Sequence, residues 1–218
     1  MGDPCHDPSA EGEIDQTQTV YTLRDGGRIL VRPLRASDAP ELAAQYEELS
    51  APARRLRFFN APEHLSGQLL EYLVDIDGDN RFALGARMLD EPGQPGVAVA
   101  RYVRDHDDPT TAEAAATVLD SYCSRGIGTI LLTSLVDVAR AHGITTFTAS
   151  VMWENRALLD SLRAYGAVVE PDEPGVAAVS VELPRDAEEF AGSTLHRVLQ
   201  AVAQAVRFGA APNHHRDD

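Results

Sequence analysis

A short loop with two glycines is the first candidate for chemistry. It spans residues 123–129, CSRGIGT, between a β-rich segment and a segment with helical periodicity. The first turn of a helix has backbone N–H groups without intrahelical partners and a partial positive charge, so it can bind a phosphate. Gly126 and Gly128 place no side chain between this backbone and a ligand. The loop predicts an anion site made of backbone groups, with a simple turn as the alternative.

Two familiar phosphate-binding motifs do not describe this loop. The dinucleotide motif requires a third glycine, and its position holds Leu131. The loop of nucleoside triphosphatases requires a Lys-Ser or Lys-Thr pair, and no such pair follows Gly128. The anion is therefore expected to belong to another kind of ligand.

Glu113 is a candidate general base a few residues before the loop. On an extended strand it shares a face with Ala115 and Thr117, and it is a polar exception in an alanine-rich run. An amine nucleophile with a pKa near ~10.4 must lose a proton before it can attack, and a carboxylate raised in pKa by burial can accept that proton. The alternative is a glutamate exposed at the start of an edge strand.

The elements that would position these residues follow from hydrophobic periodicity and turn signals. Ser37 or Asp38 can cap a helix, and Glu41 is placed to close a capping box on Asp38. Gly143 suits the position that ends the helix after the loop. Strands are expected at 28–34, 81–88, 96–104, 112–119, 145–152 and 177–183, and helices from about 38 to 50 and at 52–59, 64–74, 126–142 and 155–165.

This order predicts an α/β protein with a mixed sheet that is mostly antiparallel, flanked by helices. Residues 1–18 are expected to be disordered, residues 19–184 to form the folded domain, and residues 185–218 to form an amphipathic helix and a polar tail. The helix at 186–208 either packs on its own domain or serves as a partner or dimer contact. The pair His214-His215 lies in the tail, where we expect no metal site.

Composition excludes some classes of partner. The chain has 34 acidic and 19 basic residues, a net charge of −15. Nucleic acid is not expected as a partner. The acidic surface either attracts cationic partners or only aids solubility. No signal pattern or membrane-spanning run is evident, and two cysteines, Cys5 and Cys123, form no disulfide framework. We therefore expect a cytoplasmic protein without membrane association.

The motifs together resemble the GNAT superfamily of N-acetyltransferases, over about residues 23–183. That family's acyl-CoA loop reads Gln/Arg-x-x-Gly-x-Gly/Ala. The segment 112–118, AEAAATV, is similar to its catalytic strand, and 151–159, VMWENRALL, to its next strand and helix. The segments 32–38, RPLRASD, and 56–59, LRFF, look like the Pat-type branch of bacterial protein lysine acetyltransferases.

This resemblance implies direct transfer of acetyl from acetyl-CoA to an amine, with Glu113 as the general base and no metal. It implies that Val118 pairs with the pantetheine arm, that the loop backbone holds the pyrophosphate, and that Asn155 steadies the pantetheine. The acetyl-CoA residues so implied are Val118, Ser124, Arg125, Gly126, Ile127, Gly128, Thr129 and Asn155.

Two positions depart from the family pattern, and one cluster of arginines stands outside it. Cys123 occupies the usual place of Gln or Arg, so it is expected to pack and to weaken phosphate binding modestly. Leu162 stands where many members have a tyrosine that protonates the thiolate, which leaves adequately without it. The basic cluster Arg54, Arg55 and Arg57 is expected to form a solvated helix face, with contact to a CoA phosphate or an acidic partner as the alternative.

The acceptor is left open by the sequence. A protein lysine is the leading hypothesis and a small amine is the second. An open acidic groove beside Glu113 favours the protein, and a closed pocket favours the small molecule. A non-catalytic acyl-CoA-binding module is the third hypothesis.

Overall fold

The computed structural model describes residues 18–59, 62–164 and 166–184. The expected N-terminal segment up to residue 17, the expected helix at 186–208 and the tail with His214 and His215 lie outside these residues. No helix in the described ranges is long and apolar enough to cross a membrane.

Within the described part of the chain, eight strands form one sheet in the order β1-β2-β3-β4-β5-β6-β8-β7. Every neighbouring pair is antiparallel except β5 and β6, which run parallel. This confirms the predicted mixed, mostly antiparallel sheet. The strands are β1 (Thr19–Thr22), β2 (Arg28–Pro33), β3 (Arg81–Met88), β4 (Gly96–Arg104), β5 (Thr111–Val118), β6 (Thr146–Met152), β7 (Val168–Pro171) and β8 (Val176–Glu182).

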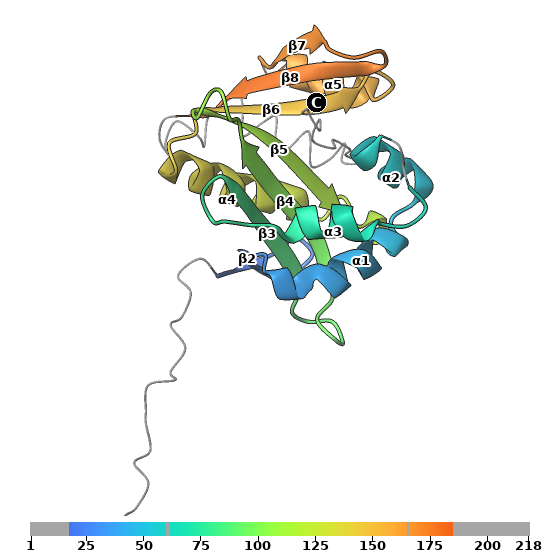
Figure 1. Cartoon of the computed structure of the whole chain (residues 1–218). Coiled ribbons are helices and arrows are strands. Elements are labelled where there is room, and N and C mark those ends of the chain that lie inside the picture. The colour runs from blue at the N-terminus through green and yellow to red at the C-terminus, as the bar shows by residue number, and fades with distance from the viewer. Residues whose placement is uncertain (1–17, 60–61, 165, 185–218) are drawn as a thin grey trace, which may run out of the picture.

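The parallel strands β5 and β6 separate partway along their length. Their register runs from Thr111 opposite Thr146 to Glu113 opposite Thr148. Beyond Glu113, β5 continues to Val118 and pairs only with β4 on its other side. Backbone groups on this edge of β5 are therefore available to a ligand, and Figure 1 shows the two strands diverging there.

Helices cover both faces of the sheet (Figure 1). Helix α4 packs on β3, β4 and β5, whereas α1 packs on the opposite face of β4 and against α3; α5 contacts β7. The helices are α1 (Ala39–Glu48), α2 (Ala51–Phe58), α3 (Gly67–Val74), α4 (Ile127–Ala141) and α5 (Arg156–Ala164).

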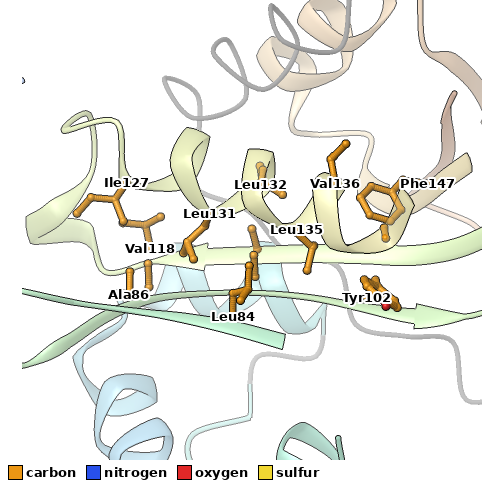
Figure 2. Packing of buried hydrophobic residues seen from close by; sticks show 14 of the residues in the cluster. Leu84, Ala86, Tyr102, Val118, Ile127, Leu131, Leu132, Leu135, Val136 and Phe147 are labelled. Carbon is orange, nitrogen blue, oxygen red and sulfur yellow. The ribbon is translucent and has the colours of Figure 1, made fainter. Parts of the chain in front are cut away.

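The main core lies between α4 and the sheet. Ile127, Leu131 and Leu135 are spaced four residues apart on one face of α4, and all three are almost completely buried. Figure 2 shows these side chains pointing from α4 toward the strands, where they meet residues such as Leu84 and Val118. Burial of this stripe fixes the rotation of α4 and thereby the direction of the loop that precedes it.

The structure corrects the predicted capping box at the start of α1. Glu41 does not reach back to Asp38; it accepts a hydrogen bond from the Gly96 N–H at 2.9 Å and pairs with Arg87. Asp38 instead forms a two-pronged ion pair with Arg32, at 2.7 and 2.8 Å. The contacts of Asp38 with Arg32 and of Glu41 with Arg87 and Gly96 therefore replace the predicted capping box.

The other differences lie at short elements and helix starts. The four-residue strands β1 and β7 were not predicted, because short edge strands carry little periodicity. Helix α3 begins at Gly67, three residues later than expected, because Ser66 accepts the Leu69 N–H at 3.1 Å as its N-cap.

Candidate active site

Glu113 lies on β5 at the last paired position before β5 and β6 separate. Its side chain is half-buried on the face that α1, α2 and α3 cover, together with Ala115 and Thr117. Burial raises the pKa of Glu113 to about 7; the positive charges of Arg57 and Arg101 lower it in part, and Asp172 raises it further. A carboxylate with this pKa can take a proton near neutral pH and release it again.

Arg57 is a buried member of this site that the sequence interpretation missed. It lies on α2 with 4% of its surface exposed, and its Nε–H donates to Oγ1 of Thr117 at 3.1 Å. Burial, followed by repulsion from Arg101, lowers the pKa of Arg57 to about 10, and Glu113 opposes this shift. The guanidinium stays charged at neutral pH.

The prediction of a solvated face for the whole arginine cluster is therefore wrong for Arg57. Its neighbour Arg55 does lie on the surface, where it pairs with Glu154 at 2.9 Å. Arg54 donates to the backbone carbonyls of Leu49, Glu63 and Glu47. The three arginines thus have three different roles, and only one faces the candidate base.

Arg101 is a second buried arginine beside Glu113. It lies on β4 directly opposite Ala115, and 4% of its surface is exposed. Its guanidinium stacks over the ring of Tyr72, with 4.6 Å to the ring centroid. Nη1 and Nη2 have no hydrogen-bond partner among the described residues. Burial lowers the pKa of Arg101. The sequence interpretation missed Arg101 as well. The signal that could have indicated it is the position of an arginine inside the apolar run of β4.

A pocket adjoins these arginines on the same face of the sheet. Its walls are mostly apolar, and Arg57, Arg101 and Thr117 are among its polar groups. Leu42 and Tyr46 of α1 and Leu73 of α3 also line it. No carboxylate is among the described lining residues, so the pocket is not an acidic groove.

The predicted phosphate loop has the geometry of an anion site. Gly126 precedes α4 with φ +92°, and a Cβ built there would meet no atom within 4 Å. Ser124 also has positive φ, +65°. The N–H groups of Ile127 and Gly128 belong to the first turn of α4, which leaves them without acceptors inside the helix. These features fit a pyrophosphate group.

The guanidinium of Arg125 pairs with carboxylates of the protein, so it is not simply a phosphate ligand. Its Nε donates to Oδ2 of Asp25 at 2.6 Å, and its Nη1 lies 3.6 Å from Oε1 of Glu91. The guanidinium lies over the ring of Tyr122 at 5.5 Å. The loop therefore presents its backbone, and Arg125 braces the loop against the β1–β2 turn.

The remaining predicted residues lie around the separated strands. Val118 is the last residue of β5 and is buried. Asn155 is half-buried between β6 and α5, and its carbonyl accepts the Leu159 N–H at 3.1 Å. The thiol of Cys123 lies 3.5 Å from the carbonyl of Leu119, and Leu162 is buried. No metal-binding group of three His, Cys, Asp or Glu side chains occurs in the described ranges.

A backbone anion site, an exposed strand edge and a half-buried glutamate together suit an enzyme that transfers an acyl group from a nucleotide-linked thioester. The chain belongs to the Acetyltransferase (GNAT) family, whose model matches residues 43–166. It is accordingly an N-acetyltransferase.

Relatives of known name support this membership. Acetyltransferase PA5475 of Pseudomonas aeruginosa is 30% identical over 164 residues, which cover 75% of this chain and 88% of that protein. Acetyltransferase Pat of Mycolicibacterium smegmatis is 30% identical over 192 residues, 88% of this chain. The match spans only 57% of that longer protein.

Solved structures agree. The GNAT domain of S. lividans PAT is 28% identical, with a TM-score of 0.68; the match covers 79% of this chain and all of that domain. The acetyltransferase yncA of Salmonella typhimurium, solved with acetyl-CoA, is 16% identical over 73% of this chain and 96% of that one, with a TM-score of 0.55. At that identity the likeness shows the fold alone.

Proposed function

We propose that this enzyme transfers acetyl from acetyl-CoA directly to an amine, with Glu113 as the general base. The observation that carries the proposal is the position of Glu113, half-buried where β5 and β6 separate, with a pKa of about 7. Glu113 accepts the proton of the amine, directly or through water, and the nitrogen lone pair becomes free to attack. Bound acetyl-CoA supplies the thioester, whose carbon–sulfur bond breaks as the amide bond forms.

Residues already described are suited to hold acetyl-CoA. The backbone of β5 up to Val118 is unpaired toward β6 and can hydrogen-bond the pantetheine amides. The N–H groups of the loop, residues 124–129, would bind the pyrophosphate, and Asn155 would steady the pantetheine. Backbone N–H groups on the edge of β5 would stabilise the oxyanion that develops on the thioester carbonyl.

Two classes of acceptor follow from different observations. The resemblance to Pat-type enzymes supports a protein lysine. The pocket on the same face of the sheet as Glu113, lined by Arg57 and Arg101, supports a small molecule.

Thiol release from acetyl-CoA tests the proposed reaction. Wild type and Glu113→Gln are compared on a panel of lysine-bearing proteins and free amines. We expect acceptor-dependent release by the wild type and a loss of about 100-fold or more in the variant, with acetyl-CoA binding retained. Tight acetyl-CoA binding without turnover on any acceptor would favour the non-catalytic module instead.

A further inference from the structure

The pocket between the sheet and helices α1–α3 contains the buried guanidinium of Arg101, whose two terminal nitrogens have no hydrogen-bond partner among the described residues. We call it the Arg101 pocket. Most of its wall is aliphatic or aromatic, and its lining is Leu34, Leu42, Gln45, Tyr46, Leu49, Arg57, Phe58, Leu65, Leu73, Val97, Ala98, Val99, Arg101, Ala115, Thr117 and Leu119. Such a wall suits a ligand with an apolar body.

Arg101 is the residue of this pocket whose hydrogen-bond donors are not satisfied within the described part of the chain. It is 4% exposed, yet Nη1 and Nη2 have no hydrogen-bond partner among the described residues, and its guanidinium lies over the ring of Tyr72. A buried guanidinium without acceptors is costly, because its hydration is lost and nothing replaces it. A carboxylate matches the fork of a guanidinium with two parallel hydrogen bonds.

The balance of charges around Arg101 favours the binding of one more anion. The groups that act electrostatically on Arg101 are Tyr72, Arg81 and Glu113, and Arg57 faces the same pocket. Glu113 is the one carboxylate among them. Once Glu113 has taken a proton from the acceptor, none of the groups acting on Arg101 is a carboxylate anion.

The strand register sets the distance between Arg101 and the candidate base. Arg101 is directly opposite Ala115, and Glu113 is two residues along the same face of β5. Diagonal neighbours of this kind have Cα atoms about 7–8 Å apart. Ala115 has only a methyl group, so the space between Glu113 and Arg101 is not filled by its side chain.

We infer that the Arg101 pocket binds the carboxylate of the acceptor, which is a small amino acid with an apolar side chain. Its amine faces Glu113, its carboxylate pairs with Arg101, and its side chain lies among the leucines of the pocket. This inference rests on the proposed function and specifies its acceptor class.

Three compounds with one side chain test the inference: L-leucine, leucinamide and 3-methylbutylamine, of which only leucine has the carboxylate. We expect wild-type kcat/KM for leucine to exceed that for the other two by about tenfold or more, as a charge-assisted pair predicts. In Arg101→Met this ratio should fall to near one, whereas Arg28→Met, at an exposed arginine on β2, should keep it. Equal wild-type rates on all three compounds would overturn the inference.

Binding of an acid provides a readout that does not depend on turnover. 4-Methylpentanoate, which is leucine without its amine, should bind wild type and Glu113→Gln saturably in calorimetry and should compete with leucine. If neither acetylates any amine but both bind this acid, the proposed function fails and the carboxylate site stands. Acetylation of proteins without any binding of the acid would overturn the inference and leave the proposed function intact.

Discussion

The Nε–H of Arg57 donates to Oγ1 of Thr117 at 3.1 Å, although the two residues are sixty positions apart. This bond joins α2 to the strand that carries Glu113. Because Arg57 is 4% exposed, the hydroxyl of Thr117 replaces part of the hydration that the guanidinium has lost.

Replacing Thr117 by valine should therefore destabilise the fold. Thr117→Val keeps the shape of the side chain and removes the acceptor, so we expect the free energy of unfolding to fall by about 1 to 2 kcal/mol. Thr117→Ser, which keeps the hydroxyl, is the matched control and should lose less. Urea denaturation measures both, and equal losses would show that the hydrogen bond contributes nothing.

The two ends of α4 allow the phosphate loop to be tested separately from stability. Gly126 and Gly143 have φ of +92° and +79°, and a Cβ at either position would meet no atom within 4 Å. Each substitution to alanine should cost about 1 to 2 kcal/mol through backbone strain. Only Gly126→Ala should also raise the KM for acetyl-CoA, by about tenfold, because it displaces backbone donors. A matching KM increase in Gly143→Ala would contradict this placement of the pyrophosphate.

Asp25 holds Arg125 beside the same loop. The hydrogen bond from Arg125 in turn lowers the pKa of Asp25. In Asp25→Asn the guanidinium loses a competing carboxylate and becomes available to phosphate. We expect the KM for acetyl-CoA to fall by about twofold to fivefold at low salt, the range of an exposed ion pair. Asp160→Asn, which removes an exposed pair with Arg163 on α5, serves as the control. An increase in KM would mean that Asp25 is needed to shape the loop.

The raised pKa of Glu113 also has a consequence for stability. Burial moves it from 4.5 to about 7, so between these values the folded protein binds more protons than the unfolded chain. The contribution of this carboxyl to stability is therefore complete below about pH 4.5 and is lost as the pH rises through 7. Glu113→Gln cannot ionise, so it should be more stable than wild type at pH 8, by up to about 3 kcal/mol, and similar at pH 5. Thermal denaturation at both pH values measures this, and a variant less stable than wild type at pH 8 would contradict it.

Sequence reasoning predicted the elements that follow a strong local rule. The loop before α4 and the end of that helix at Gly143 both depend on residues within one or two turns of each other. The order of the long strands also follows from alternation and turn signals, and the family resemblance supplied the role expected of Glu113.

The missing parts of the site depend on tertiary contacts. Arg57 lies in a helix whose composition favours exposure, and only the packing of α2 on β5 buries it. The burial of Arg101 depends on the register of β4 with β5 and on Tyr72 from α3. Glu41 likewise prefers distant partners to the local capping box. In each case a residue far away in the chain decides the environment of a charge.

The pH dependence of kcat/KM for the acetyl acceptor tests the role of Glu113 most directly. With acetyl-CoA saturating, the wild-type profile should show an inflection near pH 7, because activity requires the ionised carboxylate. In Glu113→Gln the inflection should disappear and the rate above pH 7 should fall by about 100-fold or more. An unchanged inflection near pH 7 in the variant would show that another group titrates there and that Glu113 is not the base.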